Sequence, residues 1–338
     1  MPAVSVLLPC YNSVTTLPEA LHSLDCQTLS DFEVIMVDDG SEDGSAAVLQ
    51  QWAYRDPRFH YLHQSHQGII PALNRGIACC QAPLVARMDA DDRSHPDRLA
   101  QQVDFLSAHS EVGVVSCRVV GFPPDHIRQG FAVYLEWINT ITTPEDFRRE
   151  IFVESPLPHP SVTFRKECIL QAGAYQEHGW PEDYDLWLRL YLNDVLFARL
   201  PGVLLEWREH PGRLTRIDRR YSLENFFRAK AYYLMRGPLA GCDGVFIWGA
   251  GMMGRRLGKQ LLQLNAPLAG YVDIDPLKIG RTRYGFPVIS PADLSGELRR
   301  FARPVLLAAV GSRGARPLVR QRIVPLGLVE GQEWWFAA

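Results

Sequence analysis

The sequence predicts an α/β protein of two domains, each with a largely parallel sheet covered by helices. Two observations carry this prediction: apolar runs of strand length alternate with helix-period segments over roughly the first hundred residues, and the alternation starts again near residue 243. A third is the length, because 338 residues are enough for two domains of ordinary size.

Composition and charge narrow the class of protein. Apolar residues make up 47% of the chain and charged residues 22%, which is ordinary for a globular protein with substantial cores. The formal net charge of -3 gives no general reason to bind nucleic acid, and no nucleic-acid partner is expected. No apolar run approaches the ~20 residues of a membrane span, and the start of the chain lacks a signal-peptide pattern. The seven cysteines are never spaced C-x-x-C, so we expect buried free thiols in a reducing cytoplasm.

The first domain opens with four apolar runs that predict strands and three segments that predict helices. The strands are expected in "VSVLLPCYN", "FEVIMVDDGS", "RFHYLHQ" and "PLVARMDADD". The helices are expected in "TLPEALHSLDCQ", "AAVLQQWAY" and "PALNRGIACC". In the first helix, apolar residues recur with the helical period at Leu17, Ala20, Leu21 and Leu24. Strand–helix–strand units of this kind build parallel sheets, whose ligands bind outside the carboxyl ends of the strands.

Three polar strand ends are therefore expected along one rim of this sheet. They comprise residues 9–12, 38–41 and 89–92. Three such ends on one edge favour a binding site over three unrelated surface turns.

Beyond residue 112 the pattern becomes mixed, with short strands and one clear helix, "EDYDLWLRLYL". Another helical stretch, "SLENFFRAKAYYLMR", lies in a segment expected to connect the domains. The second alternation runs from "GVFIWGAGMMGRRLGKQLLQL" through "LAGYVDID", "PADLSGELRRF", "PVLLAAVG" and "PLVRQRIVPL" to "EWWFAA". We therefore expect a first domain over residues 1–216, a helical connector over 217–242 and a second domain over 243–338.

Asp89, Asp91 and Asp92 place three like charges directly after an apolar run, in "ARMDADDRSHPDRL". Like charges at this spacing repel, so water, an arginine or a metal ion has to compensate them. Residues i and i+2 of a strand point the same way, so Asp89 and Asp91 can address one divalent cation. Mg²⁺ and Mn²⁺ take one or two carboxylates together with water and substrate phosphates, which suits a nucleotide diphosphate. The alternative at this point is a solvated turn between a strand and a helix.

Two further acidic pairs each have two interpretations. In "VDDGS", Asp38 and Asp39 either accept hydrogen bonds from a base or ribose, or stabilise an Asx turn. In "WPEDYDLWLRL", Glu182 and Asp183 open a helix. One of them is either the general base for an acceptor hydroxyl or a complement to the helix dipole. Because a helix amino end lowers the pKa of a carboxyl, we expect a base that is ionised well below neutral pH.

Taken in order, these motifs make the chain similar to a known family. It resembles the family 2 inverting glycosyltransferases, which have the GT-A fold. The resemblance rests on "VSVLLPCYN", "SLDCQTLSDFEVIMVDDGSEDGS", "GIIPALNRGIACCQAPLVARMDADD", "HPDRL" and "HPSVTFRKECILQAGAYQEHGWPEDYDLWLRL". It covers about residues 2–216, nearly two thirds of the chain, and its specificity lies in the order and spacing of the motifs.

The resemblance implies roles for residues at the donor end of a site. Asp89 and Asp91 correspond to the family's D-x-D motif. Asp91 is the expected direct metal ligand, while Asp89 lies near the ribose and is a second candidate ligand. Asp39 would contact the nucleobase. The residues expected to line the nucleotide end are Pro9, Tyr11 and Asn12.

The resemblance also implies the acceptor end and the reaction. Asp183 corresponds to the catalytic base, with Glu182 beside it. "WREHPGRLTR" resembles a stretch near the diphosphate, so Arg208 is a candidate donor contact and His210 a candidate metal ligand. The implied reaction is Mn²⁺- or Mg²⁺-dependent, inverting transfer of a hexose from a nucleotide sugar, a UDP-sugar favoured, to a glycan or lipid-linked acceptor hydroxyl. The implied setting is cell-surface polysaccharide synthesis, in the cytoplasm or peripherally at the inner membrane face.

The second domain carries a strand, the motif G-x-G-x-x-G and a helix, with Asp273 ending the next strand. The glycines are Gly249, Gly251 and Gly254, and an acid ~20 residues further on completes a dinucleotide-binding pattern. A Rossmann-like domain is therefore expected, with NAD(P) or another nucleotide as candidate ligand. The alternative is a fold that keeps its glycines for packing. "GYVDIDPLKIGRTRYGFPVIS" also resembles small nucleotide-binding domains attached to sugar-modifying enzymes, which leaves substrate-contacting, regulatory and docking roles open.

Other functions compete with glycosyl transfer. A nucleotidyltransferase would need a glycine-rich, basic loop after the first strand, and "LPCYNSVTT" has neither glycine nor lysine. An NAD-dependent sugar-nucleotide oxidoreductase and a noncatalytic nucleotide-sugar-binding protein stay open. The connector "NFFRAKAYYLMR" also has two interpretations, because its aromatic and basic residues suit either packing between domains or contact with a membrane that carries the acceptor.

Overall fold

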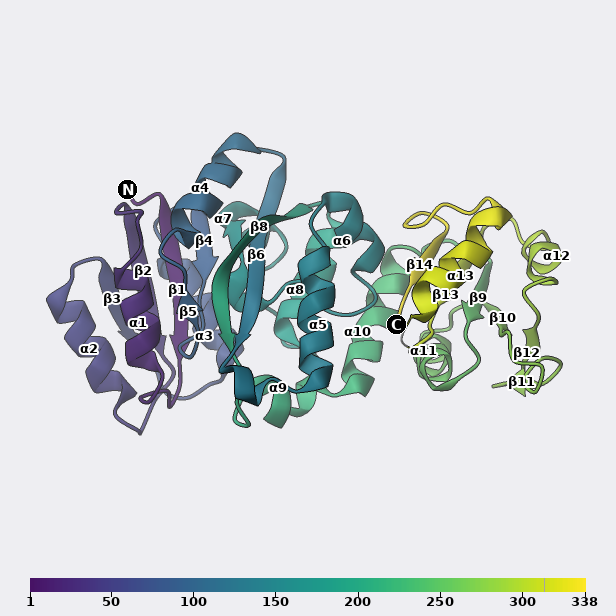
Figure 1. Ribbon diagram of the computed structural model, residues 1–338, viewed down its shortest axis with the longest axis horizontal. Helices are drawn as coiled ribbons and strands as arrows, with labels where there is room; N and C mark the ends of the chain where they lie inside the picture. The colour runs from purple at the N-terminus through teal and green to yellow at the C-terminus, as the bar shows by residue number, and fades with distance from the viewer. Residues whose placement is uncertain (313) are drawn as a thin grey trace. The chain divides into compact units, whose positions relative to one another are not determined.

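The computed structural model describes residues 1–312 and 314–338, and these fall into two compact units (Figure 1). Unit 1 comprises residues 1–147, 156–178 and 182–217. Unit 2 comprises residues 148–155, 179–181 and 218–338. Unit 2 therefore takes two short segments from within the predicted first domain, and it includes the helical stretch between residues 217 and 242.

Unit 1 is built on a mixed sheet of eight strands, counted over the described residues, in the order β3-β2-β1-β4-β7-β6-β8-β5. The strands are β1 (Val4–Cys10), β2 (Phe32–Asp38), β3 (Phe59–His63), β4 (Leu84–Arg87), β5 (Arg93–Ser94), β6 (Val112–Phe122), β7 (Thr163–Arg165) and β8 (Leu196–Arg208). The first four run parallel, while β7 is antiparallel to β4 and β6, and β5 is antiparallel to β8. The fourth predicted strand ends at Arg87, so the three acids of the D-x-D motif lie in the turn beyond it.

The helices predicted for the first half of the chain are present. The helices of unit 1 are α1 (Leu17–Asp25), α2 (Ser45–Arg55), α3 (Ile69–Cys79), α4 (Arg98–Ala108), α5 (Gln129–Thr140), α6 (Pro144–Glu150, whose last turn belongs to unit 2), α7 (Lys166–Gln171), α8 (Glu182–Leu192) and α9 (Leu214–Ile217). The 3₁₀ turns are η1 (Pro124–His126) and η2 (His159–Ser161). Helix α1 buries the predicted stripe of Leu17, Ala20, Leu21 and Leu24, as an amphipathic helix on a sheet should.

The register of the parallel strands brings their carboxyl ends together. Cys10 of β1 lies opposite Asp38 of β2, and Leu7 lies opposite Arg87 of β4. The N–H of Asp39 donates to the carbonyl oxygen of Cys10 at 2.9 Å, which extends the pairing past the strand ends. The residues that follow β1, β2 and β4 therefore share one rim, as the strand-end rule predicts.

A buried arginine fixes the end of β4. Arg98 of α4 is fully buried, and its Nη2 atom donates to the carbonyl oxygen of Arg87 at 2.5 Å. Its Nε atom donates to Oε1 of Gln102 at 3.2 Å, and the Gln102 amide donates to the carbonyl oxygen of Ser161 at 2.8 Å. Burial lowers the pKa of Arg98 because the charged form loses solvation. These bonds tie α4 and η2 to the strand that leads into the acid cluster.

Unit 2 contains a six-stranded sheet, again counted over the described residues, in the order β11-β12-β10-β9-β13-β14. The strands are β9 (Gly244–Trp248), β10 (Leu268–Val272), β11 (Thr282–Arg283), β12 (Phe286–Ile289), β13 (Pro304–Ala308) and β14 (Trp334–Phe336). The helices and turns are η3 (Arg219–Tyr221), α10 (Leu223–Arg236), α11 (Met252–Gln263), α12 (Leu294–Leu298), α13 (Ala315–Ile323) and η4 (Val324–Leu326). All strands of this sheet other than β11 run parallel to one another, namely β12, β10, β9, β13 and β14. Going along the chain, the strand order reverses direction at β9, as in a doubly wound sheet.

One element of unit 2 was not predicted. Strands β11 and β12 form an antiparallel hairpin, closed by Tyr284 and Gly285, which both have positive φ (52° and 85°). Two residues of this conformation form the type I′ turn that suits a tight hairpin.

Two predictions about the whole chain can be compared with the structure. All seven cysteines are free thiols, as predicted, but only Cys10, Cys80 and Cys117 are buried, while Cys26 and Cys79 are exposed. Within the described residues, every helix is too short or too polar to cross a bilayer.

Candidate active site

The loops that follow β1 and β2 are tied together at the rim. The N–H of Asn12 donates to Oγ of Ser41 at 3.0 Å, and the N–H of Glu42 donates to Oδ1 of Asn12 at 2.8 Å. Asn12 adopts a left-handed conformation (φ 49°), which asparagine tolerates better than most residues. Of the residues predicted at the nucleotide end, Tyr11 and Asn12 face solvent, whereas Pro9 is buried within β1.

Asp39 is buried just beyond β2, and its carboxylate accepts three hydrogen bonds and forms an ion pair with His66. Its Oδ1 atom accepts from Nε2 of Gln64 at 2.7 Å and from the N–H of Gln67 at 3.0 Å. Its Oδ2 atom accepts from the N–H of Gly68 at 2.8 Å and lies 2.9 Å from Nδ1 of His66. Because Gly68 is the N-cap of α3, Asp39 holds the turn that starts this helix. The neighbouring acid, Asp38, also stabilises its own turn, because its Oδ1 atom accepts from the N–H of Ser41 at 3.0 Å, but this residue is three positions on and an Asx turn needs two.

Two aromatic rings stack beside this carboxylate. The ring centroids of Tyr11 and His66 are 4.0 Å apart, with an interplanar angle of 19°. Tyr11 is 44% exposed and the His66 side chain 52% exposed. Gly40 permits this approach, because it has a φ of 76° and a Cβ there would lie 2.7 Å from the backbone nitrogen of His66. A planar, half-exposed aromatic surface therefore adjoins Asp39.

The acids after β4 form a tight cluster. Asp89, Asp91 and Asp92 offer carboxylate oxygens that all lie within 4.8 Å of one another. Asp89 forms an ion pair with the buried side chain of Arg87. Burial raises the pKa of Asp89 above its ordinary value, although the Arg87 charge opposes this shift. Burial, together with the charges of Asp91 and Asp89, raises the pKa of Asp92 well above its ordinary value. The cluster thus holds more negative charge than its surroundings compensate.

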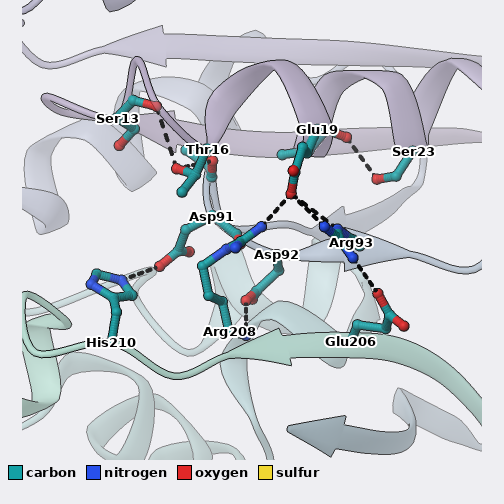
Figure 2. A network of polar contacts seen from close by, with 12 residues as sticks. Ser13, Thr16, Glu19, Ser23, Asp91, Asp92, Arg93, Glu206, Arg208 and His210 are labelled. Atoms are coloured by element: carbon teal, nitrogen blue, oxygen red, sulfur yellow. Dashed lines mark hydrogen bonds and ion pairs between the residues drawn. The ribbon is translucent and has the colours of Figure 1, made fainter. Parts of the chain in front are cut away.

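The end of β8 covers this cluster (Figure 2). The backbone N–H of Arg208 donates to Oδ1 of Asp92 at 2.8 Å, and its Nε atom donates to the carbonyl oxygen of Asp91 at 2.6 Å. Its Nη2 atom donates to Oε2 of Glu19 at 2.5 Å. The Nε2 atom of His210 lies 2.8 Å from Oδ2 of Asp91. Arg208 therefore clamps the acid-bearing turn, and His210 adds an imidazole to it.

Glu19 connects α1 to the same turn through a second arginine (Figure 2). Nη2 of Arg93 donates to Oε2 of Glu19 at 2.8 Å, and Nη1 of Arg93 donates to Oε2 of Glu206 at 3.3 Å. The hydrogen bond from Arg93 lowers the pKa of Glu19, and the bond from Arg208 adds to the effect. Because these side chains are half exposed, we assign them a role in positioning the turn and only a small contribution to the stability of the fold.

The chemistry of this cluster fits a divalent cation. Oδ2 of Asp92 is buried and has no hydrogen-bond partner among the described residues, so one carboxylate oxygen is left without a donor. Asp91 and His210 supply a carboxylate and an imidazole at its edge. Carboxylates with an imidazole suit Mn²⁺, and carboxylates with water suit Mg²⁺.

Glu182 and Asp183 form the first turn of α8, as predicted. Glu182 is 2% exposed, and the backbone N–H of Tyr184 donates to Oδ1 of Asp183 at 2.6 Å. Burial, with the neighbouring charge of Glu182, raises the pKa of Asp183 to about 7. The expectation of a base ionised well below neutral pH was therefore wrong. The helix amino end does favour the carboxylate, but loss of solvation and a like charge outweigh it.

Arg87 relates the acid cluster to α8. It pairs with Asp89, and its charge lowers the pKa of Asp183 against the raising effects of burial and Glu182. Nearby, Nε2 of His159 lies 2.6 Å from Oη of Tyr175. Burial, with the Arg87 charge, lowers the pKa of His159 well below its ordinary value, so this histidine is a neutral core residue. One buried cation therefore acts on acids from both motifs.

In unit 2, the predicted glycine-rich turn lies between β9 and α11. A Cβ on Gly254 would lie 1.7 Å from the carbonyl oxygen of Gly249, so close packing requires this glycine. A Cβ on Gly251 would meet nothing within 4 Å. Oδ2 of Asp273 accepts from the N–H of Ala250 at 2.9 Å. The predicted acid thus bonds to the turn itself.

Two basic residues adjoin this turn. Nζ of Lys278 lies 3.2 Å from Oδ2 of Asp273, whose Oδ1 atom accepts from the N–H of Asp275 at 3.0 Å. Nε of Arg283 donates weakly to the carbonyl oxygen of Ala250 at 3.4 Å. The turn therefore combines backbone N–H groups with two cations.

The mixed sheet of unit 1, with acids at the strand ends and at the start of α8, has the GT-A fold, and its sequence relatives identify the chain as a glycosyltransferase. Among solved structures, Staphylococcus aureus TarS (residues 1–349) in complex with UDP-GlcNAc matches with a TM-score of 0.56 at 19% identity, covering 77% of this chain and 72% of that chain. At this identity the likeness concerns the fold alone.

Sequence relatives give the family. Residues 5–167 match the family model described as glycosyl transferase family 2. The amylovoran biosynthesis glycosyltransferase AmsE of Erwinia amylovora is 33% identical over 207 residues, covering 60% of this chain and 75% of that protein. The Escherichia coli UDP-Gal:alpha-D-GlcNAc-diphosphoundecaprenol beta-1,3-galactosyltransferase is 30% identical over 210 residues, covering 61% and 74%. The chain belongs to glycosyltransferase family 2.

Sequence reasoning missed several residues of the site, among them Arg87 and His66. Arg87 stands only two positions before Asp89, and this short distance was the one signal in the sequence that could have indicated it. His66 carried no such signal, because its position depends on the path of the loop after β3.

Proposed function

We propose that this chain transfers a sugar from a nucleotide-diphosphate donor, a UDP-sugar favoured, to an acceptor hydroxyl with inversion of configuration. The observation that carries the proposal is that Arg87 pairs with Asp89 and its charge also acts on Asp183. This supports the proposal that the D-x-D acids and the first turn of α8 belong to one site, as a donor–acceptor reaction requires.

Asp39 and Tyr11 make up the nucleobase end of the donor site, with Pro9 and Asn12 supporting the loop. A nucleobase would stack on Tyr11 and donate a ring N–H to Asp39, and the ribose would lie near Asp89. UDP is favoured because the Escherichia coli relative is named for UDP-Gal and the TarS structure holds UDP-GlcNAc.

Asp91, Asp89 and His210 are the residues that would hold Mn²⁺ or Mg²⁺. The bound cation supplies charge neutralisation for the diphosphate leaving group. Arg208 keeps the acid-bearing turn in place, through its bonds to Asp91 and Asp92, and is a candidate contact of the donor.

At the acceptor end, Asp183 is the general base, and the charge of Glu182 raises the pKa of Asp183. The Asp183 carboxylate takes the proton of the acceptor hydroxyl as the acceptor oxygen bonds to the anomeric carbon. The bond between that carbon and the donor phosphate oxygen breaks, which releases the nucleoside diphosphate. A pKa of about 7 leaves Asp183 both ionised and basic enough for this step near neutral pH.

Proton NMR of the first-formed product tests inversion. With an α-linked UDP-sugar and water as a slow acceptor, we expect the β-anomer to appear before mutarotation. Appearance of the α-anomer would contradict the proposal, and Asp183→Asn serves as the control for background hydrolysis.

The acceptor we propose is a glycan, free or lipid-linked, in cell-surface polysaccharide synthesis. AmsE is named for amylovoran biosynthesis, and the Escherichia coli relative acts on a diphosphoundecaprenol-linked sugar. A lipid-linked acceptor implies a cytoplasmic chain that works peripherally at the inner membrane face. Co-sedimentation with vesicles that contain the lipid acceptor tests this placement.

For unit 2 we propose nucleotide binding at the glycine-rich turn, where Gly251 leaves room and Lys278 and Arg283 supply charge. The bonds of Asp273 to Ala250 and Asp275 disfavour a dinucleotide held by its ribose, because that carboxylate is already engaged. NAD-dependent redox chemistry is therefore the less supported alternative, and absorbance of NAD(P)H with a nucleotide sugar tests it directly.

A further inference from the structure

His66 occupies a place beside two predicted nucleobase contacts. Its ring stacks on Tyr11 with centroids 4.0 Å apart, and its Nδ1 atom lies 2.9 Å from Oδ2 of Asp39. The same nitrogen lies 3.2 Å from the carbonyl oxygen of Asp39. Because a carboxylate and a carbonyl are both acceptors, Nδ1 carries the hydrogen.

We propose that His66 is a specificity-determining residue that competes with the nucleobase for Tyr11 and Asp39. The inference rests on the proposed function, because it assumes that a nucleotide binds at this end. A uracil or guanine offers a flat ring and a ring N–H, which are the two groups that His66 presents here. The base and His66 therefore cannot both stack on this face of Tyr11 and contact Oδ2 of Asp39, so the donor has to displace the histidine.

The hydrogen bonds of Asp39 support this competition. Each carboxylate oxygen has room for about two donors: Oδ1 already has two, while Oδ2 has one donor and the ion-pair contact with Nδ1 of His66, which takes the second place. Two of these donors are backbone N–H groups at the start of α3, and a third is the amide of Gln64, which is 7% exposed. His66 is the one half-exposed side chain of the set. It is thus the partner that can leave with the least disturbance of the fold.

The stacking geometry supports the same conclusion. At 4.0 Å between centroids and 19° between planes, no base fits between Tyr11 and His66. Displacement of His66 opens that face of Tyr11 and the Oδ2 atom of Asp39 together. The site should then prefer bases that donate a ring N–H to Asp39. A base with only a ring acceptor at that position would bring an acceptor lone pair against the carboxylate, which is repulsive.

Calorimetric titration with UDP and with CDP in the presence of Mn²⁺ tests the proposal. Removing the competitor in His66→Ala should lower the Kd of UDP roughly three- to tenfold, the range for one exposed hydrogen bond and one ring pair. CDP, which has a ring acceptor in place of the N–H, should gain less. His63→Ala is the matched control, because His63 is 57% exposed and pairs with the adjacent Asp38 at 3.1 Å; it should match the wild-type chain.

The outcomes separate this inference from the proposed function. Tighter UDP binding in His66→Ala, with His63→Ala unchanged, supports the competition. A second outcome would overturn the competition but leave the donor site in place. In it, the wild-type chain binds UDP, Tyr11→Ala binds UDP more weakly, and the affinity of His66→Ala for UDP is equal to or lower than that of the wild-type chain. If neither the wild-type chain nor His66→Ala binds UDP or CDP with Mn²⁺, both fall together.

Discussion

The Nε2 atom of His210 lies 2.8 Å from Oδ2 of Asp91, across 119 residues of chain. The contact exists because β5, directly after the acid cluster, pairs antiparallel with β8, directly before His210. It joins an imidazole to a carboxylate that we propose as a metal ligand, and the sequence distance between the two residues gives no indication of the contact.

His210→Ala should raise the Mn²⁺ concentration for half-maximal activity about 10- to 100-fold, because one group of the metal site is lost. Donor turnover measured against Mn²⁺ gives this value. His109→Ala, which removes a half-exposed histidine paired with Glu111, should leave the Mn²⁺ dependence unchanged. The same Mn²⁺ dependence in His210→Ala and the wild-type chain would remove His210 from the site.

Asp183→Asn should lower kcat by about 10²- to 10⁴-fold, the usual contribution of a general base. The Kd of UDP should change little, because the substitution affects the acceptor end. Turnover and calorimetry on the same preparation measure the two effects. Asp194→Asn alters an exposed acid two residues beyond the end of α8 and is the control. Near-normal turnover by Asp183→Asn would mean that another residue accepts the proton.

The pH dependence of kcat/KM should have an acid limb near pH 7. Asp183 accepts a proton only when ionised, and its pKa is about 7, so activity should fall tenfold per pH unit well below that value. Glu182→Gln removes a charge that raises the pKa of Asp183, so the limb should move to lower pH. Profiles from pH 5 to pH 9 compare the two chains. Superimposable limbs would show that Glu182 does not act on the catalytic group.

Asp183→Asn should also stabilise the fold at alkaline pH. The pKa of Asp183 is higher in the folded chain than the ~3.9 of an unfolded one, so the folded state binds the proton more tightly. Stability is therefore lost as the pH rises from about 4 to about 7, and an uncharged amide avoids this loss. We expect Tm to rise by about 2–4 °C at pH 8 and by less at pH 5.5. An equal gain at both values would point to packing instead of charge.

Two glycine variants distinguish a glycine that packing requires from a glycine that ligand binding requires in unit 2. Gly251→Ala adds a methyl group into open space and should leave Tm unchanged, but it should weaken nucleotide binding if the ligand lies against this turn. Gly254→Ala forces a Cβ to 1.7 Å from a backbone oxygen and should lower Tm. Thermal shifts with NAD⁺ and with UDP-GlcNAc measure both. Equal stabilisation of the wild-type chain and Gly251→Ala would place the ligand elsewhere.

Much of the fold could be predicted because local patterns determine it. The buried stripe of α1 and the acids beyond β4 follow from period and strand order, and so does their position on one rim. Arg87 could have been considered because it stands only two positions before Asp89. To predict these features, it is enough to know the neighbours of each residue along its strand or helix.

Other features depend on the folded surroundings. The raised pKa of Asp183 comes from burial, which the first turn of a helix does not reveal in sequence. The three hydrogen bonds and the ion pair of Asp39, and the stacking of His66, depend on a loop whose path is permitted by Gly40 and Gly68, both with positive φ. Nothing in "SHQG" indicates that path before the strands are in place.

Calorimetry of UDP with the wild-type chain and with Asp91→Asn, each with and without Mn²⁺, tests the donor site most directly. We expect UDP to bind the wild-type chain with Mn²⁺ and at least about tenfold more weakly without it, because the acid cluster repels the diphosphate when no cation is bound. Asp91→Asn should lose most of the Mn²⁺ effect. Equal affinity with and without Mn²⁺, unchanged by Asp91→Asn, would contradict a metal–diphosphate site at these acids.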